Sequence, residues 1–266
     1  MHDNWHTAFI TGGGSGIGLR LAEMLAGRGT RLALFDRKID DAVRQRLGAL
    51  APGSVFQEVD VRDAPALDAA VRSAVAAIGA PQLAINCAGV QRARAFEDLT
   101  AADFDFVVGV NLFGSRNFAA AVLPHLACGA NLVFIASLAG LVSNYGYAAY
   151  SASKFGVVGL AAALRIECRP RGVGVTVVCP PEVETPMVVE ERQTAPSITM
   201  QNKQFAGVVA LDDLCHDILR GAARGEWMIV SGFKARLTHL MARLAPGLGN
   251  RIVDRMVADG LRNTKS

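Results

Sequence analysis

The sequence is poor in cysteine, in aromatic residues and in excess charge of either sign. Its five cysteines are an odd number with no Cys-x-x-Cys pair, which argues against a disulfide framework and a zinc site. Lysine and arginine number 27 against 24 acidic residues, so composition does not favour nucleic-acid binding. No apolar run has signal-peptide length near residue 1, and none reaches the ~20 residues of a membrane-spanning helix. We therefore expect a cytoplasmic protein with reduced thiols and no nucleic-acid partner.

What the sequence does contain is a regular alternation of short apolar runs and helix-like segments, with 51% hydrophobic residues. Strands are expected over residues 7–10, 31–35, 54–59, 82–85, 131–136, 173–178 and 227–230. Helices are expected over 17–28, 40–50, 64–78, 103–126, 148–165 and 211–223. This order predicts an α/β fold: a single doubly wound (Rossmann) domain with a parallel sheet and helices on both faces. We place this domain at 1–231 and a short basic amphipathic helical tail at 232–266.

A glycine-rich segment, TGGGSGIG, joins the first strand to the first helix. Glycines let backbone N–H groups approach a dinucleotide pyrophosphate, and the helix N-terminus faces its negative charge. The predicted contacts are Thr11, Gly12, Gly14, Ser15, Gly16, Ile17 and Gly18. Asp36 ends the second strand, 24 residues after Gly12, where a carboxylate can take the ribose hydroxyls and repel a 2′-phosphate. NAD(H) is therefore favoured, while Arg37 keeps NADP(H) as the alternative.

Further polar and small residues stand where other strands end. Because the carboxyl ends of parallel strands meet at one edge, these segments should converge with the glycine-rich loop. Asp60 could accept a hydrogen bond from an adenine or merely cap the next helix, and Asn86 could brace the sheet. The predicted cofactor contacts at these ends are Asp60, Val61, Asn86, Ala88, Gly89, Pro180, Val183 and Thr185.

Tyr150 and Lys154 are four residues apart in an expected helix and so share one face, with Ser137 at the end of the preceding strand. A free phenol titrates near ~10, and a neighbouring ammonium should lower that pKa toward the range useful for proton transfer. Asn111 lies in the middle of an expected helix, where asparagine is unfavourable. A kink, a water site or a polar face would explain it.

These residues together resemble the short-chain dehydrogenase/reductase family, through TGGGSGIG, Asp36, Asp60, NCAG (Asn86–Gly89), Asn111, Ser137 and YSASK (Tyr150–Lys154). The resemblance implies reversible hydride transfer between a nicotinamide and a secondary alcohol or ketone, in a homodimer or homotetramer without a metal. It implies Tyr150 as general acid/base, with Lys154 also binding the cofactor ribose. Ser137 would orient the carbonyl and Asn111 would hold a relay water. Thr185 would touch the nicotinamide carboxamide.

The segment Pro180–Pro196 resembles, more locally, the 3-ketodihydrosphingosine reductase branch of that family. This implies a long-chain 3-keto or 3-hydroxy lipid-like substrate, although that branch usually favours NADPH and lacks an acid at position 36. A 3-oxoacyl-thioester reductase and a steroid or sugar alcohol dehydrogenase stay as alternatives. Outside enzymes, so do a nucleotide-sensing protein and a membrane-surface binding protein.

Two segments are expected near the substrate, but their sequences do not indicate which substrate binds. Residues 188–206 are polar and poorly patterned, which indicates a mobile lid. In the tail, Phe233, Leu237, Leu240, Met241 and Leu244 recur at helical spacing among basic residues. Such helices can pack on the substrate pocket or a neighbouring subunit, or make a peripheral contact with an anionic membrane.

Overall fold

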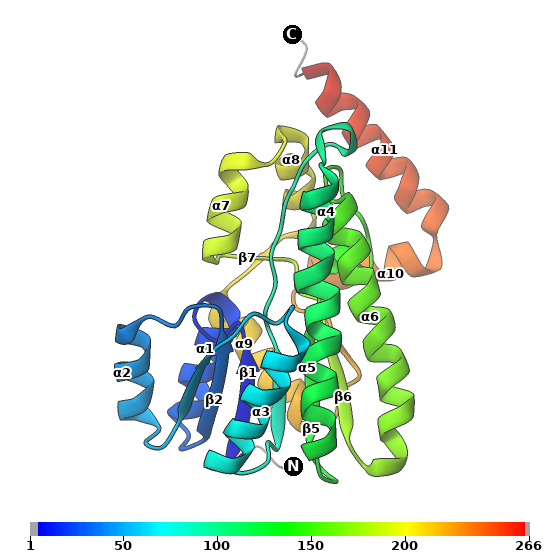
Figure 1. Ribbon diagram of the computed structural model, residues 1–266. Helices are drawn as coiled ribbons and strands as arrows, with labels where there is room; N and C mark the ends of the chain where they lie inside the picture. The colour runs from blue at the N-terminus through cyan, green and yellow to red at the C-terminus, as the bar shows by residue number, and fades with distance from the viewer. Residues whose placement is uncertain (1–4, 264–266) are drawn as a thin grey trace.

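A seven-stranded parallel sheet forms the centre of the protein in the computed structural model, which describes residues 5–263. The strands lie in the order β3-β2-β1-β4-β5-β6-β9, and every neighbouring pair is parallel (Figure 1). The chain order reverses between β1 and β4, the switch point at which such sheets bind ligands. The strands are β1 (Thr7–Thr11), β2 (Arg31–Asp36), β3 (Val55–Glu58), β4 (Leu83–Asn86), β5 (Asn131–Ile135), β6 (Gly174–Val178) and β9 (Met228–Ile229).

Helices cover both faces of this sheet. One core lies against α3 (Ala64–Ile78), α5 (Gly114–Val122) and α6 (Ala148–Cys168), the other against α1 (Gly16–Ala26), α2 (Asp41–Leu50) and α9 (Leu211–Ala223). Every residue of β1, β4 and β5 is buried, which explains why these strands are continuous apolar runs. The predicted doubly wound architecture is confirmed, with element boundaries shifted by at most three residues.

The long helix expected over residues 103–126 is interrupted. It consists of α4 (Ala101–Val108), a π turn (Gly109–Phe113), α5 and a 3₁₀ turn (Leu123–His125). Asn111 lies inside the π turn, so the unfavourable residue coincides with a break in regular hydrogen bonding. Residues 101–125 are long and apolar enough to cross a membrane, with half of the window buried inside the protein. Core helices of water-soluble proteins pass the same test.

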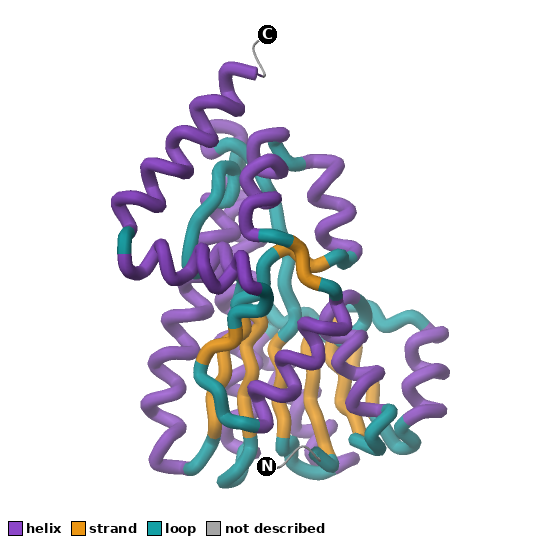
Figure 2. The backbone as a smooth tube through the Cα atoms, turned by 180° about the vertical axis from the view of Figure 1, so that it is seen from behind, coloured by secondary structure: helices purple, strands orange, loops and turns teal. Residues whose placement is uncertain are grey.

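A second layer stands above the carboxyl edge of the sheet (Figures 1 and 2). It contains the short parallel pair β7 (Glu182–Val183) and β8 (Val208–Val209) and the helices α7 (Pro186–Thr194), α8 (Ser197–Ala206), α10 (Phe233–Leu244) and α11 (Pro246–Asn263). The expected lid at 188–206 is thus helical. An ion pair to Glu182 and a hydrogen bond from Gln91, both outside the lid, hold it, and these contacts leave no local pattern in the sequence. Shorter 3₁₀ turns occur at Phe96–Asp98, Leu138–Gly140 and Arg169–Arg171.

Candidate active site

A cavity of about 660 Å³ lies between the carboxyl edge of the sheet and the upper helices. The glycine-rich loop lines one part, α6 and the lid another, and the tail helices α10 and α11 a third. The predicted site residues that line it are Gly12, Ser15, Gly16, Ile17, Gly18, Asp36, Arg37, Asp60, Val61, Ala88, Gly89, Ser137, Tyr150, Lys154, Pro180, Val183 and Thr185. Segments from six different strand ends therefore meet at one place.

Four predicted residues lie behind the cavity wall instead: Thr11, Gly14, Asn86 and Asn111. The Thr11 hydroxyl donates to Asn86 Oδ1 (2.9 Å), and the Asn86 amide donates to the Ser115 hydroxyl (2.7 Å). Thr11 Oγ1 also accepts from the backbone N–H of Ala88 (3.2 Å). Asn86 thus joins β1, β4 and α5 beneath the site, as a brace for the sheet.

The glycine-rich loop packs too closely for larger residues. Gly12 has φ +65°, and a Cβ there would lie 2.7 Å from the backbone nitrogen of Ala88. A Cβ on Gly18 would lie 2.2 Å from the carbonyl oxygen of Gly12. This packing brings the first turn of α1 against the cavity, where its free N–H groups can meet an anion. The loop therefore fits a dinucleotide pyrophosphate.

Three aspartates near the ends of β2 and β3 have different hydrogen-bond partners. Asp36 lines the cavity and accepts from the backbone N–H of Gly14 (2.9 Å), so the carboxylate is fixed beside the loop. Asp60 also lines the cavity but pairs with Arg62 (2.7 Å), which holds the pKa of Asp60 below its usual value. Asp63 caps α3 by accepting from Ala66 N–H. The capping role considered for Asp60 thus belongs to Asp63.

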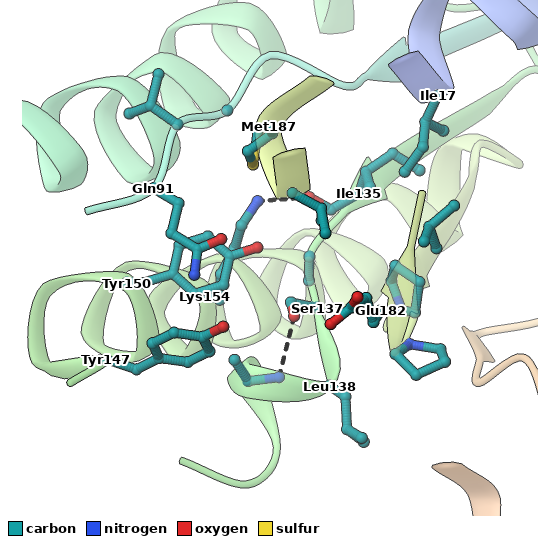
Figure 3. A pocket seen from close by; sticks show the side chains of 18 of the residues that line it. Ile17, Gln91, Ile135, Ser137, Leu138, Tyr147, Tyr150, Lys154, Glu182 and Met187 are labelled. Carbon is teal, nitrogen blue, oxygen red and sulfur yellow. Dashed lines mark hydrogen bonds between the residues drawn. The ribbon is translucent and has the colours of Figure 1, made fainter. Parts of the chain in front are cut away.

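Ser137, Tyr150 and Lys154 point into the same part of the cavity (Figure 3). Tyr150 and Lys154 come from the first two turns of α6, and Ser137 from the turn after β5. The Lys154 ammonium donates to the carbonyl oxygen of Ile135 (2.9 Å) and lies 5.7 Å from the centroid of the Tyr150 ring. All three groups are held by regular structure, so their relative positions are fixed before a substrate arrives.

The protonation of this pair differs from the sequence-based expectation. Burial raises the pKa of Tyr150 to about 12, although a hydrogen bond with Ser137 opposes the shift. Burial also lowers the pKa of Lys154 to about 8. The predicted lowering of the phenol pKa by Lys154 is wrong here, because the ammonium bonds to a backbone carbonyl and desolvation of the phenolate is the larger effect. Tyr150 is therefore a neutral phenol at pH 7, the form that can donate a proton.

Three side-chain hydrogen bonds hold Asn111 within the chain. Its amide donates to the Val90 carbonyl (3.0 Å) and to the Ser153 hydroxyl (2.9 Å), and its Oδ1 accepts from Val90 N–H (2.8 Å). A Cβ on Gly89 would lie 3.4 Å from Asn111 Oδ1 and 3.5 Å from Lys154 Nζ. Asn111 thus fixes the Val90 segment against α6, next to the lysine.

A group of polar residues on the lid side of the cavity escaped the sequence analysis. We call it the lid cluster: Gln91, Tyr147, Glu182, Glu191, Arg192 and Lys203. Tyr147 and Gln91 both donate to Glu191, and Lys203 bridges Glu191 (2.5 Å) and Glu182 (2.9 Å). Its partners lie up to 100 residues apart, so local sequence could not reveal them. The one available signal was the position of Glu182, four residues after the end of β6.

The tail contributes apolar wall to the same cavity. Met241 of α10 and Val253 and Met256 of α11 line it opposite the strand ends. The other face of α10 is exposed and apolar, formed by Phe233, Leu237, Leu240 and Leu244. The tail therefore packs on the pocket, one of the two arrangements expected for it, and also presents an uncovered apolar stripe.

Comparison with known proteins identifies the class. Residues 6–196 match the model of the short chain dehydrogenase family. The protein therefore belongs to this family and is an oxidoreductase that acts on alcohols or ketones with NAD(P).

Three curated relatives are similar over two thirds or more of this chain. The 3-dehydrosphinganine reductase TSC10A of Arabidopsis thaliana is 34% identical over 241 residues, covering 88% of this chain and 73% of its own. The 3-ketodihydrosphingosine reductase of Bos taurus is 31% identical over 228 residues (82% and 68%). The D-threitol dehydrogenase of Mycolicibacterium smegmatis is 35% identical over 182 residues (67% and 70%).

Solved structures agree on the fold. A short chain dehydrogenase from Mycobacterium paratuberculosis bound to NAD superposes with a TM-score of 0.78 at 25% identity, covering 87% of this chain and 98% of the other. One from Burkholderia cenocepacia in complex with NADP gives 0.76 at 26% identity (86% and 97%). Both forms of the cofactor thus occur among proteins similar to this chain.

Proposed function

We propose that the protein reduces a ketone on a long-chain, lipid-like substrate to a secondary alcohol, and catalyses the reverse oxidation. The observation that carries this proposal is the cavity itself. Ser137, Tyr150 and Lys154 share it with the glycine-rich loop at one side and with apolar tail residues at another. The relatives named as reductases of a 3-keto sphingoid base support a lipid substrate.

Each catalytic side chain has a defined task in this reaction. The dinucleotide supplies the hydride to the carbonyl carbon when it is bound. Ser137 and Tyr150 hydrogen-bond the carbonyl oxygen, and Tyr150 gives its proton as negative charge develops there. Lys154, whose pKa near 8 makes it the more acidic group, can restore that proton. Asn111 secures the wall beside Lys154 and is proposed to hold a relay water.

For the cofactor we propose NAD(H) over NADP(H). Asp36 is fixed by the loop and presents a negative charge where the adenosine ribose would lie. A 2′-phosphate would meet that charge in a partly buried site, which is unfavourable. Arg37 lines the cavity next to it and is the feature that favours NADP(H).

Two surfaces support proposals about partners. The exposed stripe of α10, with Phe233 at 81% and Leu244 at 73% exposure, is suited to peripheral contact with a membrane, because Lys234, Arg236 and Arg243 flank it. The outer face of the π turn and α6, with exposed Phe113, Phe155 and Ile166, is suited to a second copy of the chain. We propose a cytoplasmic homo-oligomer that can attach to membranes; sedimentation velocity would measure its size.

The test is a turnover screen with NADH and NADPH across long-chain 3-ketones, 3-oxoacyl thioesters, steroid ketones and polyols. Long-chain 3-ketones should react best. Tyr150→Phe should lower turnover by about 10²- to 10⁴-fold, because it removes the proton donor, yet leave dinucleotide binding unchanged. Polyols are the second candidate, favoured by the similarity to D-threitol dehydrogenase. Unchanged turnover in Tyr150→Phe would refute the assigned chemistry.

A further inference from the structure

We propose that Glu191 is a positioning residue for the proposed reaction: it holds Tyr147 from the lid, and Tyr147 in turn holds the ring of the proton donor Tyr150. This inference rests on the proposed function, because it explains how Tyr150 is kept in place for proton transfer. The lid would then influence the rate of the chemical step as well as enclose the substrate.

Glu191 lies on α7 behind the cavity wall, with 2% of its side chain exposed. Its Oε1 accepts from the Tyr147 hydroxyl and from the Gln91 amide (2.7 Å). Its Oε2 accepts from Lys203 Nζ (2.5 Å). These partners come from the start of α6, from the segment after β4 and from α8. The carboxylate therefore ties the lid to the body of the protein.

The charges around Glu191 are already balanced within the chain. Lys203 bridges Glu191 and Glu182, and Arg192 bonds to Glu182 (2.6 Å). Two cations thus meet two carboxylates, so this buried pair needs no charge from a ligand. The Tyr147 hydroxyl is a neutral donor to Glu191, because burial raises the pKa of that phenol. The bond to Tyr147 is therefore available for positioning.

Tyr147 transmits this hold to Tyr150. Tyr147 directly precedes α6, and Tyr150 lies in the first turn of the same helix. Both side chains are buried, and their rings meet edge to face with centroids 5.4 Å apart and planes at 70° (Figure 3). This is a favourable geometry for two aromatic rings. With its hydroxyl fixed at Glu191, Tyr147 gives the ring of Tyr150 a fixed surface to rest on.

The ring contact matters because the hydroxyl of Tyr150 has another task. That hydroxyl bonds to Ser137, and in the proposed reaction both groups turn toward the carbonyl oxygen. A contact that uses the hydroxyl cannot also fix the ring while the proton moves. The contact with Tyr147 leaves the hydroxyl of Tyr150 free for the substrate.

A second contact holds Glu191 from the opposite side of the cavity. Asn111 bonds to both backbone groups of Val90 (2.8 and 3.0 Å) and donates to the Ser153 hydroxyl on α6 (2.9 Å). Gln91 is the next residue after Val90, so its amide reaches Glu191 from a fixed segment. Movement of α7 would therefore break the bonds of Glu191 to both walls.

The first measurement is kinetic, with NADH and a long-chain 3-ketone on the full chain. Glu191→Ala should lower kcat by about tenfold to a hundredfold, since misplacement of a catalytic group has effects of this size. KM for the ketone and the affinity for the dinucleotide should not change. Glu191→Gln keeps an acceptor for the Tyr147 hydroxyl and should recover most of the loss. Tyr147→Phe should also lower kcat but add little to Glu191→Ala, because both variants remove the same bond.

The second measurement needs no turnover. The chain has three tyrosines, Tyr145, Tyr147 and Tyr150, so 3-fluorotyrosine labelling gives three fluorine NMR signals that single Tyr→Phe variants assign. In Glu191→Ala the signals of Tyr147 and Tyr150 should shift and broaden, because both rings lose their fixed orientation. The signal of Tyr145 should stay in place.

The matched controls are Glu184→Ala, at a carboxylate that is 73% exposed, and Tyr145→Phe, at a phenol outside the cavity lining. Both should keep kcat and the Tyr150 signal. An unchanged kcat or an unchanged Tyr150 signal in Glu191→Ala would overturn the proposal. So would a loss confined to KM, which would mean that the lid only binds the substrate.

Two further outcomes are separated by this design. If Glu191→Ala does not fold, Tyr147→Phe decides, because it removes a single oxygen atom: an unchanged kcat there also overturns the proposal. If the wild type reduces no ketone, the proposed function fails. The fluorine signals then still show whether Glu191 holds the ring of Tyr150.

Discussion

Replacing Lys154 by methionine should stabilise the protein while abolishing its activity. Methionine keeps most of the apolar stem but removes an ammonium that is buried against the sheet. The Lys154 side chain is enclosed between α6 and the ends of the central strands, with Cys87 and Cys179 nearby. Turnover should fall because the proposed partner of Tyr150 is lost.

The expected gain in stability follows from the pKa of Lys154. A fall from 10.5 to about 8 means that folding disfavours the charged form by about 3 kcal/mol, since one pKa unit is worth ~1.4 kcal/mol. The variant also loses the hydrogen bond from the charged amine to the Ile135 carbonyl, which costs about 1.5 kcal/mol. The net gain is therefore roughly 1.5 kcal/mol at pH 7, or about 3–6 °C in Tm for a chain of this size.

The difference in stability between Lys154→Met and the wild type depends on pH. Between the folded pKa near 8 and the unfolded value of 10.5, the unfolded chain binds more protons, so wild-type stability rises with pH. The advantage of Lys154→Met should thus be full below about pH 8 and shrink above it. Urea unfolding at pH 7 and pH 9.5 measures this, with Lys38→Met, an 84% exposed lysine, as the neutral control. A variant less stable than wild type, or a difference that ignores pH, would refute the reasoning.

Two further predictions concern the cofactor and the tail. Asp36→Ala should improve kcat/KM with NADPH relative to NADH roughly tenfold, because a charge repulsion is removed; no improvement would show that Arg37 already decides the choice. Leu240→Glu should weaken flotation with phosphatidylserine-containing vesicles by about tenfold, because it places a charge on the apolar stripe of α10. Leu50→Glu, at a similarly exposed leucine on α2, should float like the wild type, and equal losses in both would contradict the membrane contact.

The sheet and the cofactor half of the site could be predicted because their signals are local. Each strand is an apolar run, and in a parallel sheet all carboxyl ends meet at one edge. The sequence alone could thus predict that one site contains Asp36, Ser137 and the glycine-rich loop. A kink was one of the three explanations considered for Asn111, and the π turn lies at this position.

The substrate half could not be predicted, because its contacts join distant parts of the chain. Glu191 and Lys203 belong to the site only because they contact Tyr147, Gln91 and Glu182. The helices of the lid also show no clear apolar face. The pKa of Tyr150 was missed for a related reason. Spacing along a helix places Lys154 nearby, but burial by the whole fold decides which effect is larger.

The tail that roofs the cavity has a consequence for how the binding site is assembled during synthesis. The glycine-rich loop lies within the first 20 residues to be synthesised. Val253 and Met256 are added more than 200 residues later. A nascent or proteolysed chain that ends near Gly232 would retain the glycine-rich floor. It would lack the apolar tail residues that we propose to contact a hydrocarbon chain. Such fragments would keep the residues proposed for the dinucleotide and lose part of the wall proposed to select the substrate.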